Sequence, residues 1–524
     1  MRLILSTLLL FSVLAHAYSQ ESTESTVSSR FLRGLESNVS ASATIGSGDY
    51  SPLWLHSNRY GMESSEPNSC YLRVGLFRSM ASDSSYQWRY GYGIDLAVSA
   101  NHVSTFTVQQ LYLDIGWKHG LLSIGSKERP MELKNNLLSS GSQTLGINSR
   151  PIPQVRLELP KYWTVPFTKG WLQFRGHISY GMMTDDHWQH DFTRKQSRYT
   201  NHVLYHTKAG YIRIKHEDYD YPLSFEGGLE MACQFGGTTY SFPNGVKQKI
   251  VNSKNVSSFF HALIPGGGEM SEHGTVYENT EGNNLGSYVL RLNYDKPRWG
   301  LGIYFERFFE DQSGMFGIDY DGYGKGDSWN HHKSNRWLVY DFKDMMVGVE
   351  LELKRVRWLR HIVAEYLHTK YQSGPIYHDH NPGLSDHIGG NDNYYNHYVY
   401  PGWQHWGEAI GNPLYYSPLY SEDGSITFKN NRFMAFHLGL SGELSNELTY
   451  RFLASWEEGV GTYRSPFTSR LHQGTFLAEA TYSPLSKKLA GWSCRVGVGL
   501  DVGSIIGDNF GCQLTVFRKI KIRD

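Results

Sequence analysis

The sequence lacks any long apolar run beyond its first residues. A membrane-spanning helix needs about 20 consecutive apolar residues, and no later segment approaches that length. This absence excludes a helical membrane protein. The mean hydropathy of -0.45 would ordinarily indicate a soluble protein. It is equally compatible with a membrane β-barrel, because alternating strands put polar residues in the lumen and lower the average.

An excess of one charge is also absent, since 50 Lys and Arg residues balance 50 Asp and Glu residues. A nucleic-acid-binding protein would need a basic excess or a basic face, so we expect no nucleic-acid partner. Cysteine is scarce, whereas a secreted disulfide scaffold is short and rich in it. A turn centred near Gly507 would place Cys494 opposite Ile520 and not Cys512. We therefore expect free, buried thiols.

Motifs of nucleophilic, metal-dependent and nucleotide-dependent enzymes are missing. There is no Gly-x-Ser-x-Gly elbow, no His-Glu-x-x-His, no P-loop and no dinucleotide fingerprint. We expect a protein without enzymatic activity, cofactor or metal. Because carboxylates, serines and histidines are plentiful, a hydrolase stays open as a rival interpretation.

The N-terminus has the pattern of an export signal. Arg2 supplies a positive charge, residues 3–14 form an apolar run, and Ala-His-Ala follows at 15–17. This pattern predicts a signal peptide over residues 1–17, with an N-terminal membrane anchor as the alternative. The polar segment 18–44 is then expected to lie in the periplasm.

Alternation of apolar and polar residues with a period of two dominates the remaining chain. Apolar side chains occupy every other position from Trp492 to Val502, and 510–516 repeats the pattern after a turn-like Gly-Asp-Asn sequence. Such segments predict β-strands with one apolar and one polar face. Further examples are 87–98, 110–117, 288–294, 434–440 and 448–456.

The character of these strands favours a membrane barrel over a soluble β-sandwich. They are near ten residues long, as tilted spanning strands require, and their apolar faces often begin or end with aromatic residues. Their other faces carry Gly beside charges, which suits a crowded polar interior. We therefore predict a monomeric, transmembrane antiparallel β-barrel of about 16–18 strands over residues 45–524, its lumen partly plugged by loops or short helices.

The predicted connections are of two kinds. Those at 295–298 and 441–446 are short and turn-like, whereas 184–201, 235–253, 311–336 and 373–431 are long and polar. Short periplasmic turns and long outer loops would give this asymmetry.

The long connection 373–431 is unusually aromatic for a loop. Aromatic rings stack on sugars while Asn, Asp and His bond their hydroxyls, so carbohydrate binding is one interpretation. A metal site at His378, Asp379 and His380 is a second. A loop packed on itself in the barrel mouth or lumen is the third. The candidate polysaccharide contacts in this loop are Tyr394, Tyr395, His397, Trp403, Trp406 and Asn412.

Three arginines around a Pro-rich segment form a second candidate site. Arg150, Arg156 and Arg175 could present paired N–H donors to the carboxylates of acidic sugars. The alternative is salt bridging within the lumen to interior acids such as Glu350 and Glu352.

Six blocks follow one another in order along most of the chain, at 48–55, 57–61, 150–159, 166–171, 392–397 and 411–414. Together they resemble the capsule assembly Wzi family in the form found in the Bacteroides group. The resemblance implies an outer-membrane barrel of a Gram-negative bacterium that organises or retains capsular polysaccharide and is not an enzyme. Polysaccharide and outer-membrane lipid are then the expected partners, and a general or substrate-specific porin is the main alternative.

Overall fold

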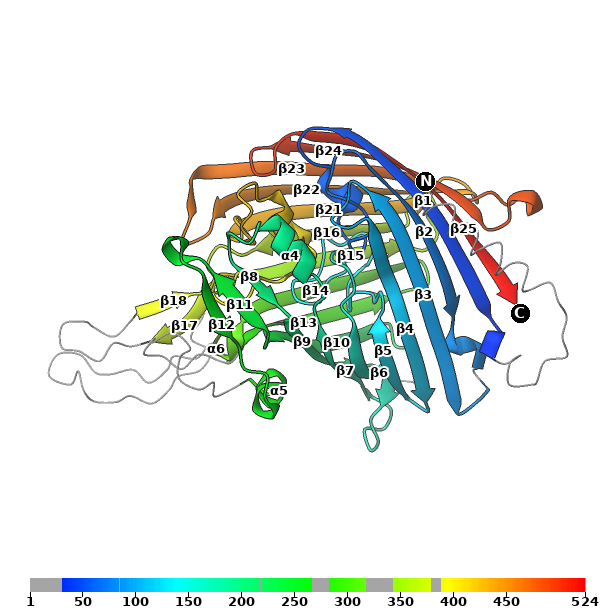
Figure 1. The fold of residues 1–524 in the computed structure, drawn as a ribbon. Helices are drawn as coiled ribbons and strands as arrows, with labels where there is room; N and C mark the ends of the chain where they lie inside the picture. Colours follow the sequence, from blue (N-terminus) through cyan, green and yellow to red (C-terminus); the bar gives the residue numbers. More distant parts are fainter. Residues whose placement is uncertain are drawn as a thin grey trace.

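The computed structural model describes residues 31–83, 85–216, 218–265, 282–316, 343–377 and 388–523. Eighteen strands form one closed antiparallel barrel, in which each strand pairs with its neighbours along the chain and β1 pairs with β25 (Figure 1). The predicted barrel is confirmed. Its strands are β1 (Leu35–Ser47), β2 (Ser69–Arg78), β3 (Trp88–Ala100), β4 (Phe106–Trp117), β5 (Gly120–Ser126), β6 (Gln154–Thr164), β7 (Leu172–Met182), β9 (Leu204–Ile214), β10 (Leu223–Phe235), β13 (Asn283–Asp295), β14 (Trp299–Glu310), β15 (Met345–Leu353), β16 (His361–His368), β21 (Phe433–Glu443), β22 (Leu448–Gly461), β23 (Pro466–Tyr482), β24 (Trp492–Gly503) and β25 (Asn509–Arg523).

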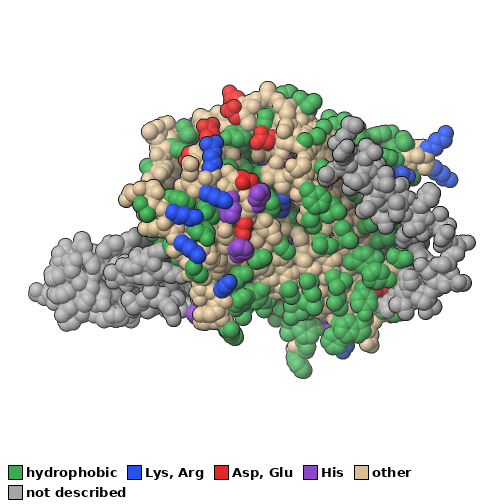
Figure 2. Space-filling view, viewed as in Figure 1, with side chains coloured by type: hydrophobic (Ala, Val, Ile, Leu, Met, Phe, Trp, Pro, Cys, Tyr) green, Lys and Arg blue, Asp and Glu red, His purple; other side chains and the backbone are tan. Residues whose placement is uncertain are grey.

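The alternation read from the sequence separates the two faces of the barrel wall. In β24, Val498 and Leu500 are exposed on the outside, whereas Gly497 and Asp501 are buried on the inside. Hydrophobic side chains accordingly cover much of the outer wall in the space-filling view (Figure 2). An apolar outside and a polar inside are what a membrane-spanning barrel requires.

Two details of the prediction need correction. The barrel begins at Leu35, inside the segment 18–44 that was expected to precede it, because β1 pairs with both β2 and β25. In the β24–β25 hairpin, Cys494 lies opposite Val516 and not Ile520. The four cysteines form no disulfide with one another, but only Cys233 is fully buried.

The two ends of the barrel differ in their connections. One end, called the turn end here, has short links such as 118–119, 296–298 and 444–447. The other, the loop end, carries 183–203, 236–282, 311–344 and 369–432. Figure 1 shows these long connections on the side opposite the chain termini. They contain α4 (Asp186–Phe192), α5 (Val256–Leu263), α6 (Asp311–Phe316) and the short strands β8 (Tyr199–Asn201), β11 (Thr238–Ser241), β12 (Gln248–Val251), β17 (Ser373–Tyr377), β18 (Ile388–Asn391), β19 (Gln404–His405) and β20 (Glu408–Ala409).

Within the part of the chain that the structure describes, no helix is long and apolar enough to cross a membrane.

Three loop-end segments fold back into the lumen and form a packed plug. They are 48–68, which contains α3 (Leu53–His56), then 127–153 and 393–431. Their apolar side chains share one core with inward-facing wall residues. Trp54 and Trp403 are completely or almost completely buried in it. The plug is therefore packed like a protein interior.

Carboxylates on the inner wall hold the segment 127–153. Glu306 of β14 pairs with Lys134 and accepts a hydrogen bond of 2.9 Å from the Gln143 amide. Glu365 of β16 accepts one of 2.8 Å from the Ser140 amide. These bonds give polar backbone groups inside the lumen the partners that burial demands.

The other two plug segments are held in the same way. Asp501 of β24 accepts a hydrogen bond of 3.0 Å from the Leu53 amide at the start of α3. Glu457 of β22 accepts one of 2.6 Å from the Asn430 side chain. Each plug segment is thus tied to the wall by at least one inward-facing carboxylate.

Replacing Lys134 with Met should loosen the plug. Lys134 and Glu306 are both buried, so the substitution leaves the Glu306 carboxylate without its cation, at a cost of about 3–5 kcal/mol. We expect lower unfolding stability in detergent and higher ion conductance in planar bilayers. Lys354→Met is the control, because Lys354 pairs with exposed Asp295 at the turn end and should lose less than about 1 kcal/mol. Equal effects of the two variants would contradict this account of the plug.

Candidate functional site

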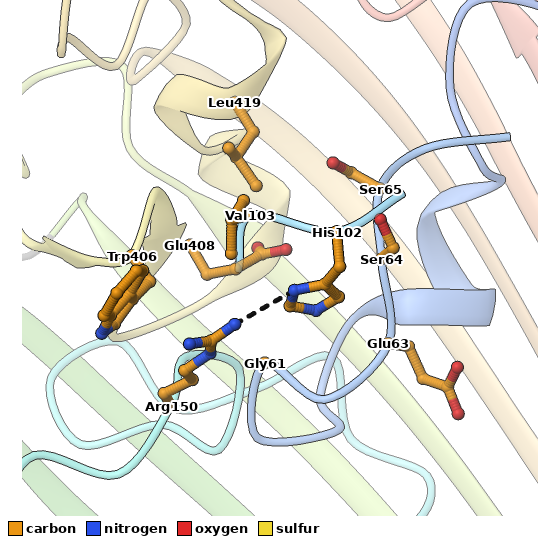
Figure 3. Close-up of a pocket in the computed structure, with 10 residues that line it drawn as sticks. All are labelled: Gly61, Glu63, Ser64, Ser65, His102, Val103, Arg150, Trp406, Glu408 and Leu419. Atoms are coloured by element: carbon orange, nitrogen blue, oxygen red, sulfur yellow. Dashed lines mark hydrogen bonds between the residues drawn. The ribbon is translucent and has the colours of Figure 1, made fainter. Parts of the chain in front are cut away.

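A small pocket at the loop end brings together two of the candidate residues, Arg150 and Trp406. The plug segments and the β3–β4 turn supply its walls, and Figure 3 shows the Arg150 side chain between Trp406 and His102. Its cavity volume of about 10 Å³ has room for roughly one water molecule. In this state the pocket can receive a single functional group and not a sugar ring.

Arg150 is held in the pocket by neutral partners. Its side chain is 6% exposed, its Nη2 lies 3.0 Å from His102 Nδ1, and its guanidinium stands 4.6 Å from the centre of the Trp406 ring. Its Nε has no hydrogen-bond partner. Among the described residues no carboxylate forms an ion pair with Arg150. The hydrogen bond to His102 and stacking on the Trp406 ring are therefore its close side-chain interactions among the described residues.

Electrostatics fix the protonation states in this pair. Burial, followed by the nearby Arg150 charge, lowers the pKa of His102 to about 3, so the imidazole is neutral and its Nδ1 accepts the bond from Arg150. Burial also lowers the pKa of Arg150 to about 10, which leaves the guanidinium protonated at neutral pH. The pocket thus contains one buried cation, and the buried side chains of Glu63 and Glu408 line it as well.

A tight hairpin positions Trp406. The strands β19 and β20 are joined by Trp406 and Gly407, both with positive φ, as the two-residue turns of hairpins require. A side chain at Gly407 would collide with Leu419 and Trp188. The indole Nε1 donates to Thr184 Oγ1 over 3.3 Å, so the ring is fixed from the loop before α4.

A larger cavity lies on the turn-end side of the plug. It has a volume of about 460 Å³, and five basic side chains and three carboxylates line it. Arg150 borders it as well as the small pocket. Candidate residues Arg156 and Arg175 face this cavity from β6 and β7. All three candidate arginines therefore line this one cavity, and of the three only Arg150 also lines the small pocket.

Arg156 and Arg175 are held by carboxylates, as the alternative interpretation stated, but the partners differ from those expected. Arg156 bonds to Glu158 over 2.5 Å, and Arg175 to Glu132 over 2.6 Å. Glu350 bonds instead to Arg291 and lies within ion-pair distance of His361. Glu352 lies near Arg360, at 3.6 Å.

Most of the aromatic candidates belong to the plug. Tyr394, Tyr395, Trp403 and Asn412 are buried and present no surface to a polymer in this state. Trp403 donates from Nε1 to the Thr144 carbonyl, and the Tyr395 hydroxyl accepts from the Asn412 amide. His397 Nδ1 accepts from the amides of Val399 and Tyr400 and so shapes its own loop.

Sequence reasoning missed His102, Lys127 and Arg129. The charged run Lys-Glu-Arg at 127–129, directly after a strand, was an available signal for the larger cavity. His102 gave none, since only the fold brings it to Arg150. The metal candidates His378, Asp379 and His380 lie outside the described residues. Within those residues, no group of three or more His, Cys, Asp or Glu could hold a metal.

Comparison with known proteins shows similarity at the level of fold. No protein-family model and no curated protein matches the chain. The outer-membrane protein Wzi of Escherichia coli, described as a carbohydrate-binding β-barrel involved in group 1 capsule assembly, aligns with a TM-score of 0.55 at 11% identity, over 95% of this chain and 86% of its own. OprD of Pseudomonas aeruginosa aligns with a TM-score of 0.44 at 10% identity, over 94% of this chain and 96% of its own. OccAB4 of Acinetobacter baumannii aligns with a TM-score of 0.44 at 9% identity, over 94% of this chain and 99% of its own.

The neutral state of His102 makes a testable contribution to the pH dependence of stability. Below pH 6.5 the unfolded chain takes up a proton at His102, whereas the folded chain does not until about pH 3. The free energy of unfolding should therefore decrease as the pH is lowered from about 6.5 to about 3, by up to about 1.4 kcal/mol per pH unit from this group. His102→Gln keeps an acceptor for Arg150 without titrating, so it should lose less stability than the wild type between pH 7 and pH 4. Unfolding in detergent measures this difference.

The control for this experiment is His119→Gln, which changes an exposed histidine of the β4–β5 turn. It should keep the pH dependence of the wild type. If His102→Gln does so too, the proposed protonation state of His102 is wrong.

Proposed function

We propose that this protein resides in the outer membrane of a Gram-negative bacterium and attaches or assembles capsular or exported polysaccharide at the cell surface, without enzymatic activity. The plugged lumen is the observation that carries this proposal. A role at the surface uses the loops as a binding platform and needs no open passage. The family resemblance of the sequence blocks and the fold shared with the carbohydrate-binding barrel Wzi support it.

Loop length supports an orientation with the loop end outside. Barrels of this class have short periplasmic turns and longer extracellular loops. In that orientation the Arg150–Trp406 pocket opens towards the cell exterior, and the larger basic cavity lies on the periplasmic side of the plug.

The same plug argues against the main alternative, a porin. A porin needs a water-filled path through the barrel. Here Trp54, Trp403 and Tyr395 pack in the lumen with almost no exposed surface, and wall carboxylates bind the segments that carry them.

Arg150 and Trp406 are the proposed polymer contacts at the mouth. An aromatic ring beside a cation suits a sugar that carries a carboxylate, because the ring packs on C–H groups and the guanidinium donates to the anion. The small pocket takes only the charged group, so the sugar ring would lie across its opening. Many such weak contacts along one polymer add through effective concentration, so no single site needs to be tight.

Binding of purified cell-surface polysaccharide from the source bacterium to the detergent-solubilised protein tests the proposal. Trp406→Ala should weaken binding about fivefold, because it removes one aromatic contact. Trp358→Ala, at an exposed tryptophan of the turn end, is the matched control and should bind as the wild type does. No binding by the wild type would count against the proposed function.

Planar-bilayer recording separates the proposed function from the porin alternative. A plugged barrel should show almost no steady conductance, whereas a porin should conduct ions continuously. Steady conductance of the wild type would favour the porin, whatever the polysaccharide assay shows.

A further inference from the structure

The helix α5 lies against the outside of the barrel wall. It contacts β9 and β10, and Figure 1 shows it beyond the edge of the wall near these strands. The Tyr180 hydroxyl of β7 donates to the Phe259 carbonyl over 2.8 Å. Ala262 packs in a small cluster with Cys233 and Phe235 at the loop end of β10. The helix is thus part of the wall's outer surface and not of the plug.

Strand register shows that the wall residues under α5 face outward. Lys208 lies directly opposite Ile178 in the β7–β9 pair, so both side chains point to the same face. Ile178 is exposed on the apolar outside of the barrel. Lys208 therefore also points outward, where a bare ammonium facing hydrocarbon would be unfavourable.

The helix shields this outward-facing cation. Lys208 Nζ donates to the Ala262 carbonyl over 2.9 Å, in the last turn of α5, where the helix dipole favours a positive charge. The protein thus covers a polar position of the outer wall with an amphipathic helix. Such cover is needed only where the wall is in contact with lipid.

The opposite face of α5 is apolar, and its side chains are exposed among the residues that the structure describes. Val256 and Phe260 lie about one helical turn apart, and Ile264, which caps the C-terminus, follows at the same interval, so we group the three as one apolar stripe. They are 75%, 62% and 69% exposed. The stripe continues the exposed apolar surface of β7 and β9, for example at Met182 and Ile212.

The helix also has a basic end. Asn255 caps its N-terminus, and exposed Lys254 precedes it. Lys254 is next to Gly236, just beyond the loop end of β10, whereas Ala262 reaches Lys208 farther down the wall. The helix therefore starts just beyond the loop end of β10 and descends along the last residues of that strand, with its lysine uppermost and its apolar stripe below.

We infer that α5 binds an anionic lipid of the outer leaflet, with acyl chains on the Val256–Phe260–Ile264 stripe and a headgroup phosphate at Lys254. The order of lysine above apolar side chains matches that of phosphate above hydrocarbon in a lipid. The inference rests on the proposed outer-membrane location and outward loop end, and it is independent of polysaccharide binding.

Photo-crosslinking in vesicles tests this site. A photoreactive phenylalanine analogue replaces Phe260 in the full chain, reconstituted in phosphatidylcholine with or without lipopolysaccharide as the anionic lipid. Leu137 is the matched control position, since it is 65% exposed but belongs to the plug segment in the lumen. Mass spectrometry of the intact protein identifies the adducts. We expect lipid adducts at position 260, with lipopolysaccharide preferred, and none at position 137.

Lys254→Glu tests the headgroup contact in the same assay. It should reduce the lipopolysaccharide adduct at position 260 by about fivefold and leave the phosphatidylcholine adduct unchanged. The inference is overturned if position 260 gives no more lipid adduct than position 137, or if it crosslinks to protein instead. It is also overturned if the adduct shows no preference for the anionic lipid. Polysaccharide binding and conductance, measured on the same preparation, show separately whether the proposed function fails.

Discussion

The inward-facing carboxylates of the barrel wall are the constraint on which the rest of the structure depends. A segment that folds into the lumen brings backbone N–H groups and cations that must find acceptors. Asp501, Glu306 and Glu365 provide them at three separate strands, and they bind two different plug segments. Because the acceptors are fixed on a rigid wall, they set where each segment lies. The mouth pocket exists only because these segments are held beside one another.

The barrel was predictable from the sequence because one physical cause, hydrocarbon outside and polar groups inside, repeats in almost every strand. The prediction failed where that alternating signal is weak. The outward residues of β1 include Ala41 and Ala43, which are too small to mark an apolar face, so the strand that closes the barrel was missed. The predicted register of the β24–β25 pair was wrong for a different reason. Asp508 Oδ1 accepts from the Gly503 amide over 2.9 Å, and the resulting turn centres near Ile505.

The candidate site was predictable in its residue types but not in its arrangement. Trp403 and Trp406 lie in the same aromatic segment, and nothing local distinguishes them. Tertiary packing does: Trp403 stacks on Tyr205 of β9 in the plug core, whereas Trp406 occupies the hairpin turn at the mouth. Its partner Arg150 comes from another segment far away in sequence. Contacts of this kind depend on how three loops meet inside a closed barrel, and the alternation of residues along the sequence does not predict how they meet.

The arginines show why the mouth is the better place to expect an anionic ligand. Arg156 and Arg175 each form an ion pair with a carboxylate, so a ligand would have to compete with an acid that is already in place. Arg150 is hydrogen-bonded to a neutral imidazole and stacks on an aromatic ring, and Glu408 acts on it through its charge without an ion pair. A buried charge without a close counter-charge gains the most from an incoming carboxylate. The wall carboxylates thus have two effects: where they are present they fix the plug, and where none reaches Arg150 they leave a cation for a ligand.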